Sequence, residues 1–430
     1  MKMNLNTLKQ QFESGEKDNL LMDVYLDEAL LPYLRDRFSK AIDSFIDTFK
    51  ENEGEIYSAP GRTEVGGNHT DHQHGKVLAA SINRDAIAIV SKADNVNIIS
   101  AAGGGLITID INDLEKKDAE EGTTASLIRG VLAGLKKNGY TIGGFNAYVT
   151  SDVLIGAGLS SSAAFETLIG TIISGLYNDM QISAILIAQI GQYAENEYFG
   201  KPCGLMDQMA SSVGSLVTID FKDPDQPIVE KVEFDMASHG YSLCITDTKA
   251  DHVNLTPDYA AVPAEMKAAA AVFGKNYLRE VEPSQIISCI SLIREKVNDR
   301  AALRALHFIT ENARVDEQVN ALRGGDVKSF LAAVKASGDS SYKYLQNVYT
   351  NKDVEHQAVS IALGVSEYTL NNDGKNHGVA RVHGGGFAGT IAAFVENDYV
   401  TEYKNAMDSV FGENACNVLQ IRKYGGMKLI

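Results

Sequence analysis

The residues from Val153 to Ala164 combine glycine, serine and apolar side chains in an order that suits phosphate binding. The run reads Val-Leu-Ile-Gly-Ala-Gly-Leu-Ser-Ser-Ser-Ala-Ala, an apolar strand end followed by glycines, serines and the apolar start of a helix. Glycine lets the backbone approach a ligand closely, and a helix N-terminus offers unpaired N–H groups to an anion. The run predicts a nucleotide site at Gly156–Ser162, although taken alone it fits a Ser-capped turn equally well.

Two better-known glycine-rich loops do not match this run. A Walker loop ends in Gly-Lys-Ser/Thr, and no lysine is present here. A dinucleotide fingerprint, Gly-x-Gly-x-x-Gly, fits Gly156 and Gly158, but Ser161 stands at the third glycine position. A dinucleotide-dependent oxidoreductase would rest on those glycines alone and would leave the other polar blocks without a role.

A second block, Tyr57–Leu78, gathers an arginine, an Asn-His pair and an aspartate among glycines, and Pro60 predicts a break in regular structure there. Arg62 carries a planar, permanently charged fork of donors that suits phosphate or carboxylate. His69 and Asp71 can hydrogen-bond the hydroxyls of a sugar, while the ordinary alternatives are a surface ion pair for Arg62 and a turn cap for Asp71. Zinc is not favoured, because no partners at ligand spacing accompany the histidines of the block, His69, His72 and His74.

Two further blocks place acids and glycines where an enzyme could use them. In Glu195–Gly214, Glu195 ends an amphipathic helix and Asp207 begins another helix-like stretch. An acid at a helix start ordinarily complements the helix dipole, whereas a functional acid would face a sugar hydroxyl. In Arg381–Gly389 three adjacent glycines, which are costly to order, indicate close approach of the backbone to the phosphate site of another domain.

Together the four blocks resemble the GHMP small-molecule kinases and, within them, the galactokinase branch. The sugar signature of that family, Gly-Arg-x-Asn-x-x-Gly-Glu-His-Thr-Asp-Tyr, is similar to Gly61–His72, and its phosphate motif Gly-x-Gly-Leu-Ser-Ser-Ser-Ala is similar to Gly156–Ala163. Its Cys-Gly-Ile-Met-Asp-Gln block resembles Cys203–Gln208, and its Gly-Gly-Gly-Phe-Gly-Gly motif resembles Gly384–Gly389. Matches in the order of the family, from about Val24 to the C-terminus, are far more specific than any one motif.

The resemblance implies an ATP-dependent sugar 1-kinase, with galactose as substrate, and it implies a role for each matching residue. Asp207 would face the anomeric hydroxyl, as a base or as an orienting charge, and Arg62 would stabilise the transferring phosphoryl group. The implied ATP contacts are Gly156, Gly158, Ser160, Ser161 and Ser162. The implied ligands of Mg²⁺ are Ser162 and Glu195. The implied sugar contacts are Asn68, His69, Asp71, Gly204 and Tyr259.

The chain departs from the family pattern inside the sugar signature. The glutamate of the family, which contacts the C6 hydroxyl of the sugar, is Asn68 here, and the asparagine of the family is Glu64. Asparagine donates and accepts hydrogen bonds and does not repel a carboxylate. The alternative substrate is therefore galacturonate or another galactose modified at C6 or C2. Galacturonate is named because the branch that phosphorylates it also lacks the acid and carries His-Gln, as in His72-Gln73.

The alternative outside catalysis is a sensor that binds galactose and ATP without turnover. Such a protein is expected to lack part of the serine run or the catalytic acid. Ser160–Ala164 and Asp207 are both present. The sequence therefore favours an enzyme over a sensor.

Composition indicates a cytoplasmic enzyme acting on small molecules. The 430 residues, of which 44% are hydrophobic and 22% charged, suffice for two or three folded domains. A net charge of −17 disfavours nucleic acid and anionic membranes as partners. The four cysteines are scattered, which is typical of reduced thiols, and no signal-peptide core or membrane-crossing run is visible. Monomer and homodimer both stay open.

The elements that must position these residues predict an α+β fold. The family resemblance adds two lobes, each a mixed sheet covered by helices, with the active site between them. We expect an N-terminal segment, 1–21, that is frayed or docks as a helix, a first domain at 22–217 and a second at 218–430. Apolar spacing predicts strands at Ile87–Val90, Asn97–Ser100, Tyr241–Asp247 and Thr390–Val395. It predicts helices at Ala163–Tyr177, Ile182–Tyr198, Ala264–Phe273, Ser288–Lys296, Leu303–Asn312 and Ser329–Ala336.

Overall fold

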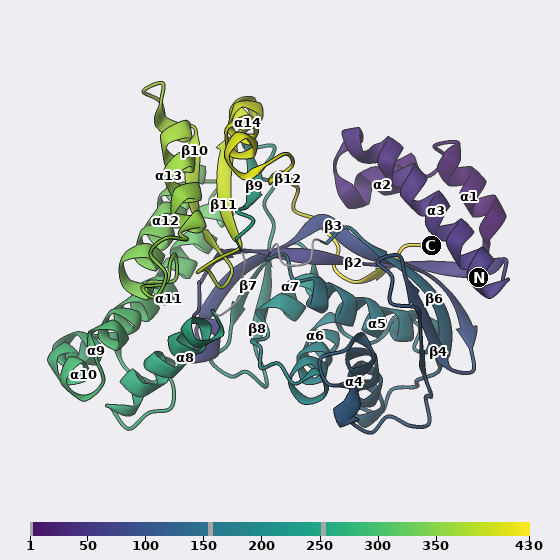
Figure 1. Cartoon of the computed structure of the whole chain (residues 1–430), viewed down its shortest axis with the longest axis horizontal. Coiled ribbons are helices and arrows are strands. Elements are labelled where there is room, and N and C mark those ends of the chain that lie inside the picture. Colours follow the sequence, from purple (N-terminus) through teal and green to yellow (C-terminus); the bar gives the residue numbers. More distant parts are fainter. Residues whose placement is uncertain (1–2, 154–157, 251–254) are drawn as a thin grey trace.

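The computed structural model of the chain describes residues 3–153, 158–250 and 255–430. In Figure 1 one sheet runs across the molecule and a second sheet stands at its end. The strands are β1 (Met3–Asn4), β2 (Glu53–Gly66), β3 (Lys76–Ala93), β4 (Val96–Ser100), β5 (Leu106–Ile109), β6 (Gly144–Ser151), β7 (Leu216–Asp220), β8 (Ile228–Val232), β9 (Tyr241–Asp247), β10 (Gly378–His383), β11 (Thr390–Glu396), β12 (Cys416–Leu419) and β13 (Met427–Lys428).

The helices cover both sheets (Figure 1). They are α1 (Leu5–Glu13), α2 (Asp18–Tyr25), α3 (Leu31–Phe49), α4 (Thr124–Lys137), α5 (Ser161–Tyr177), α6 (Ala184–Tyr193), α7 (Met206–Val213), α8 (Thr256–Ala271), α9 (Pro283–Ser288), α10 (Ile290–Lys296), α11 (Asp299–Arg323), α12 (Val327–Ser340), α13 (Ala358–Asn371) and α14 (Val400–Phe411). We call the first sheet with α1–α7 the first lobe, and the second sheet with α8–α14 the second lobe.

The first sheet is built around the long strands β2 and β3. Its path is β1–β2–β3–β6–β4–β5, with β13 added to β2 and with β7 and β8 added to β3. Side chains alternate across β3, as the period of a strand requires. Ala86, Ala88 and Val90 pack against α4, α5 and α6. Ile87 and Ile89 face the other way and pack against α1 and α3. Both faces of this sheet are therefore covered by helices.

The second sheet has the order β10–β11–β9–β12, with every pair antiparallel. One of its faces, with Ile391 and Ala393, packs on α13 and α14. The opposite face, with Ala392 and Phe394, packs on α11 and α12 in a core that also contains Leu78 of β3. This shared core joins the lobes and fixes the end of β2 against β10.

The chain returns to the first lobe at its C-terminal end. After β12, Ile421 bridges to Ile82, and β13 pairs with β2. Arg422, which is fully buried, donates to the Asp85 carboxylate at 2.9 Å, and Arg37 of α3 donates to the same carboxylate at 2.7 Å. Burial opposes the charge of Asp85, but the two guanidinium groups outweigh it and lower its pKa. Figure 1 shows both marked ends of the chain on this side of the molecule.

The predicted α+β fold with two helix-covered sheets is confirmed. The first sheet is mixed as expected, since β4 and β6 run parallel, but the expectation of a mixed second sheet is wrong, because each of its pairs is antiparallel. Strand β9 has the predicted bounds, and α5 begins two residues before the prediction. The predicted break at Pro60 is wrong, because β2 continues through it. Pro60 is accommodated where the register of β2 with β3 shifts, which is one of the few sheet positions that tolerates proline.

The predicted domain boundary between residues 217 and 218 stays a prediction. Strands of the first sheet lie on both sides of it. β7 spans residues 217 and 218, and β8 pairs with β7 in the first sheet. In the segment 1–21, Leu5, Leu8 and Phe12 of α1 are fully buried against α3. Within the described ranges, no helix combines the length and the apolar character needed to cross a bilayer.

Candidate active site

A cavity of about 640 Å³ lies between the lobes. Its wall from the first lobe comes from β2, the turn after β2 and the start of α7. Its wall from the second lobe includes Lys267 of α8 and the glycines that follow β10. The cavity brings together five residues predicted as site residues from sequence, namely Arg62, His69, Asp71, Gly204 and Asp207.

Arg62 and Asp207 form a two-pronged ion pair on the cavity wall. The Arg62 Nε donates to Asp207 Oδ1 at 2.7 Å, and Nη2 donates to Oδ2 at 2.8 Å. This parallel geometry is specific to the guanidinium fork and fixes both side chains. Arg62 is nearly buried, whereas the Asp207 side chain is 34% exposed. The carboxylate is thus held firmly and can still be reached from the cavity.

The N-terminus of α5 meets the same carboxylate. Ser160 has a left-handed backbone with φ of 57° and precedes Ser161, the first residue of α5, and no side chain caps this helix. The Ser160 hydroxyl donates to Asp207 Oδ2 at 2.5 Å. The predicted phosphate loop therefore lies directly beside the predicted catalytic acid.

Gly158 ties this loop to the rest of the site. Its carbonyl accepts a bond from Arg62 Nη1 at 2.5 Å. Its φ of +67° favours glycine, and an added Cβ would lie 2.9 Å from Thr390 Oγ1 of β11. Gly156, the remaining predicted ATP contact, lies outside the described residues.

These contacts decide the charge of Asp207. Burial disfavours its ionised form, but the Arg62 charge and the hydrogen bonds from Arg62 and Ser160 outweigh burial and lower its pKa. Asp207 is therefore a carboxylate at neutral pH. A carboxylate can orient a hydroxyl group and can accept its proton late in a reaction.

The predicted magnesium ligands lie together one turn away. The Ser162 hydroxyl is 3.3 Å from Glu195 Oε1. Lys201 Nζ contacts the same Glu195 oxygen at 3.0 Å, and Gln208 donates to Oε2 at 2.8 Å. Glu195 lies in a π-helical turn, Ala194–Phe199, that continues α6. A hydroxyl and a carboxylate are hard oxygen donors and suit Mg²⁺, which keeps several waters and binds few protein ligands.

The described histidines of the sugar signature are not part of a cluster of metal ligands. Across residues 3–153, 158–250 and 255–430, no three His, Cys, Asp or Glu side chains converge as they would around a metal ion. His69 donates from Nε2 to the Gly385 carbonyl at 3.0 Å. Burial lowers the pKa of His69 to about 4, so its ring is neutral and its remaining nitrogen is an acceptor.

Asp71 and Gly204 contact each other at the cavity. A Cβ added to Gly204 would lie only 1.9 Å from Asp71 Oδ2, so the carboxylate occupies the space that a side chain would need. Burial raises the pKa of Asp71 to about 6, with the nearby Asp207 charge acting in the same direction. Asp71 and Asp207 therefore differ in charge behaviour although they line one cavity.

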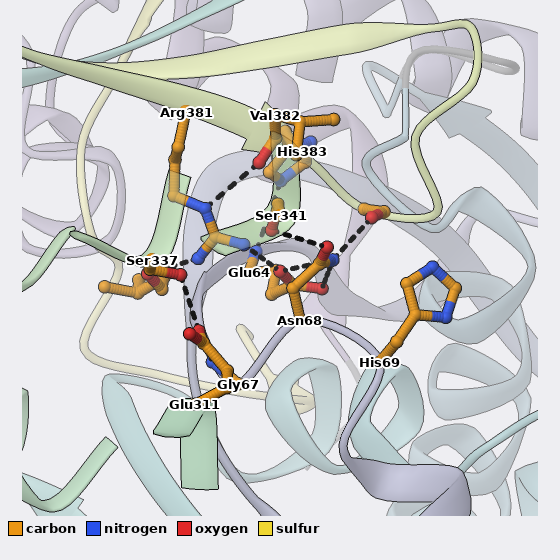
Figure 2. A network of polar contacts seen from close by, with 12 residues as sticks. Glu64, Gly67, Asn68, His69, Glu311, Ser337, Ser341, Arg381, Val382 and His383 are labelled. Atoms are coloured by element: carbon orange, nitrogen blue, oxygen red, sulfur yellow. Dashed lines mark hydrogen bonds and ion pairs between the residues drawn. The ribbon is translucent and has the colours of Figure 1, made fainter. Parts of the chain in front are cut away.

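Two predicted sugar contacts do not line the cavity. Asn68 is fully buried behind it, in the network drawn in Figure 2. Tyr259 of α8 donates to the Gly386 carbonyl at 2.7 Å and packs edge-on against Phe387. Both side chains support the loop Gly384–Phe387, which we call the glycine loop.

The glycine loop packs mainly against the sugar signature, not against the phosphate site as expected. Asn68 Nδ2 donates to the Gly384 carbonyl at 2.7 Å. A Cβ on Gly385 would lie 2.7 Å from the Tyr259 ring, and one on Gly386 would lie 2.0 Å from the Asn347 carbonyl oxygen. The glycines are thus explained by close neighbours within the protein. Of the phosphate-loop residues that the structure describes, Gly158 lies beside Thr390 and His383, on the strands that flank the glycine loop.

The structure adds residues that sequence reasoning missed. Glu64 lines the cavity, and Arg381 of β10 contacts it at 2.6 Å. His383 accepts a bond from the Glu64 backbone N–H at 3.2 Å. Arg381 and His383 were visible beside the glycine run, but their partners lie more than 300 positions away in the sequence. Asn347, which donates to Asn68 Oδ1 at 2.8 Å, carried no sequence signal.

Comparison with known proteins agrees with this site. The family model "Galactokinase galactose-binding signature" matches residues 43–92, and "GHMP kinases N terminal domain" matches residues 126–215. A galactokinase of Glaesserella parasuis is 32% identical over 367 residues, covering 83% of this chain and 88% of that protein. A galactokinase of Streptomyces coelicolor is 30% identical over 374 residues, covering 84% of this chain and 89% of that protein.

Solved structures show the same architecture. The galactokinase of Lactococcus lactis complexed with galactose superposes with a TM-score of 0.76 at 25% identity, covering 90% of this chain and 98% of that chain. A mevalonate kinase superposes with a TM-score of 0.60 at 14% identity, covering 86% of this chain and 99% of that chain, and it shows the fold alone. With its cavity, its Arg62–Asp207 pair and these relatives, the chain belongs to the galactokinase family of the GHMP kinases, which are phosphotransferases with an alcohol acceptor.

Proposed function

We propose that this protein transfers the terminal phosphoryl group of ATP to the anomeric hydroxyl of galactose, giving galactose 1-phosphate and ADP. The observation that carries the proposal is the triple contact at Asp207, where the Arg62 fork and the Ser160 hydroxyl at the start of α5 meet one carboxylate. The proposed phosphate-binding element and the cavity thereby share one residue.

The proposed chemistry follows from charge and position. Phosphoryl transfer passes through a loose transition state, so alignment and charge neutralisation supply most of the acceleration. Asp207 orients the attacking hydroxyl and accepts its proton as the new P–O bond forms. Arg62 keeps Asp207 ionised and lies between it and Gly158 of the phosphate loop, beside the group in transfer.

ATP is proposed to bind at Gly156, Gly158 and Ser160–Ser162. The uncapped N-terminus of α5 supports this, because its N–H groups and dipole attract phosphate oxygens. We propose Ser162 and Glu195 as the ligands of Mg²⁺. When bound, the ion neutralises phosphate charge and holds the triphosphate in line.

His69, Asp71 and Gly204 are the proposed sugar contacts, since all three line the cavity. Asn68 and Tyr259 are proposed to act on the sugar indirectly, by holding the glycine loop against the sugar signature. The proposed location is the cytoplasm, with which the free thiols of the described cysteines agree.

The test is a sugar panel with ATP, followed by an assay coupled to ADP release. Galactose, galacturonate and N-acetylgalactosamine are compared at equal concentration, and the position of the phosphate is read by ³¹P NMR. We expect ADP release with galactose and a phosphate on its anomeric oxygen. If none of the three sugars causes ADP release, the proposal is contradicted.

A further inference from the structure

The acid and the amide of the sugar signature have changed places in this chain. The family pattern carries asparagine four residues before glutamate, whereas here Glu64 precedes Asn68 by four residues. A loss of the acid at position 68, taken alone, would favour a substrate that carries a carboxylate. The structure shows which carboxylate lies at the cavity in place of an acid at position 68.

Glu64, whose pKa is about 7, carries a negative charge at the cavity at pH 8. Side chains two residues apart on a strand point to the same side, and Arg62 and Glu64 of β2 both line the cavity. Asn68, four residues later, is turned inward. Its Nδ2 donates to Glu64 Oε1 at 3.0 Å and to the Gly384 carbonyl, and its Oδ1 accepts from Asn347 and Ser341. Figure 2 shows Asn68 and Glu64 facing each other within this network.

The Glu64 carboxylate is held in one position. Arg381, itself 1% exposed, donates from Nη2 to Glu64 Oε1 at 2.6 Å and from Nη1 to the Val65 carbonyl at 2.8 Å. Among the described residues, Oε2 has only the longer contact with Asn68, at 3.2 Å. A carboxylate oxygen can accept more than one hydrogen bond, so Oε2 retains the capacity to accept one from a ligand.

The charges around the cavity suit a neutral polyol better than an anion. Its carboxyl groups are Glu64, Asp71 and Asp207, and the cations that line it are Arg62, which is paired with Asp207, and the exposed Lys267. Burial lowers the pKa of each histidine that lines the cavity, so these rings are neutral at pH 7 and above. Hydroxyl groups find acceptors here, and a ligand carboxylate would meet like charge.

We propose that Glu64 is a specificity-determining residue, which accepts a hydroxyl of neutral galactose and excludes galacturonate, the same ring with a carboxylate. This inference rests on the proposed sugar-kinase function. It gives the two exchanged residues different roles. Glu64 contacts the substrate, and Asn68, together with Arg381, positions the Glu64 carboxylate.

The experiment compares kcat/KM for galactose and for galacturonate, with ATP, at pH 8. The wild type is expected to prefer galactose by about 100-fold or more, since a mismatched charge at a buried polar site is strongly rejected. Glu64→Gln removes the charge and keeps the shape, and we expect it to reduce this preference by about tenfold or more. Glu64→Asp keeps the charge and is expected to retain the preference.

Glu311→Gln is the matched control. Glu311 is a buried carboxylate of the same network, bonded to the Gly67 N–H at 3.0 Å, but it does not line the cavity. Its variant is expected to leave the ratio of the two kcat/KM values unchanged. The ratio does not depend on the fraction of folded enzyme, so a loss of stability does not imitate a change in specificity.

Three outcomes overturn the inference: a wild type that phosphorylates the two sugars equally well, a Glu64→Gln ratio equal to that of the wild type, or strong competition by galacturonate against galactose in the wild type. The last measurement needs no variant and holds if Glu64→Gln fails to fold. A wild type that phosphorylates no sugar would instead overturn the proposed function, so the two failures are distinct.

Discussion

The two ends of the cavity present carboxylates that behave in opposite ways. At the end next to α5, Arg62 and Ser160 lower the pKa of Asp207 in spite of burial. At the end next to the second lobe, burial raises the pKa of Glu64 to about 7, although Arg381 opposes it. Between the two ends, beside Gly204, burial raises the pKa of Asp71 to about 6. All three groups lie near a guanidinium, so proximity to a cation does not by itself decide their charge.

The difference lies in geometry and in the number of partners. Asp207 receives both prongs of Arg62 and a hydroxyl, and a third of its side chain is exposed. Glu64 is 3% exposed and receives a single prong of Arg381. The contacts of Asp207 all come from the first lobe, whereas Glu64 depends on the second. The proposed catalytic pair is thus held within one lobe, whereas the proposed sugar-recognition carboxylate depends on the contact between lobes.

The largest effect is expected from Arg381→Met, which removes the second-lobe cation. Loss of one partner leaves a buried carboxylate unpaired, and we expect unfolding free energy to fall by about 3 kcal/mol. Urea denaturation measures this. Arg323→Met is the control, because the Arg323–Glu230 pair is about half exposed on both sides and is expected to contribute less than about 1 kcal/mol. Equal losses in the two variants would contradict the dependence of Glu64 on the second lobe.

At the other end, Asp207→Asn is expected to lower kcat by about 100-fold or more, the scale of general acid–base catalysis. The KM values for ATP and sugar should change little, because the amide keeps the shape of the side chain. Steady-state kinetics with the ADP assay provide the measurement. Asp398→Asn, on an exposed turn of the second lobe, is the matched control. Turnover near that of the wild type would remove Asp207 from the mechanism.

Gly204→Ala tests the packing between the ends. The new Cβ would lie 1.9 Å from Asp71 Oδ2, so Asp71 must move away from its position in the cavity. We expect kcat/KM for the sugar to fall on the order of 10- to 100-fold, the scale of a displacement of about 1 Å. Gly364→Ala in α13, where nothing lies within 4 Å of the added Cβ, should leave it unchanged. An unchanged value in Gly204→Ala would show that Asp71 does not position the sugar.

The smallest effect is expected in the dependence of kcat/KM for galactose on pH. Glu64 is acted on by Arg381 and Arg62, which lower its pKa, and by Asp71 and Glu311, which raise it. As pH falls through about 7 and then about 6, Glu64 and Asp71 take up protons, so each loses its negative charge and one of its oxygens becomes a donor. We expect kcat/KM for galactose to fall by about tenfold or more between pH 8 and pH 5.

The Glu64→Gln variant distinguishes the contributions of Glu64 and Asp71 to the pH dependence of kcat/KM. Glu64→Gln should abolish the decline near pH 7 and keep the one near pH 6. Because the folded pKa values are raised, both groups favour the folded state at low pH, and this contribution is lost as pH rises through 6 and 7. Activity and stability should therefore respond to pH in opposite directions. A profile that is flat from pH 5 to 8 would contradict the assignment.

Sequence alone was sufficient for the elements and residues that follow local rules. The apolar alternation of β9 and the glycine–serine start of α5 are local patterns, and both are present where predicted. Asp207 and Arg62 were matched by motif, and the structure brings them together. Pro60 misled, because the pairing of β2 with β3 outweighs the preference of a single residue.

What the sequence did not reveal is the contact between distant segments. Asn68 was expected to face the sugar because its motif does, yet Asn347 and Ser341 bind its side chain from the second lobe. The role of Glu64 depends on Arg381, 317 positions later. Such pairings depend on how the lobes pack, which no local spacing encodes.

The return of the chain to β2 has a consequence for biosynthesis. Residues 421–430 supply the strand β13 next to β2 and the second arginine on Asp85. They complete the first lobe, although most of that lobe is translated before the second lobe. On the ribosome the first lobe is therefore incomplete, with Tyr57 and Ser58 of β2 lacking their partner strand, until residues 421–430 have been made. A stop codon introduced before residue 421 would damage the half of the protein that was made first.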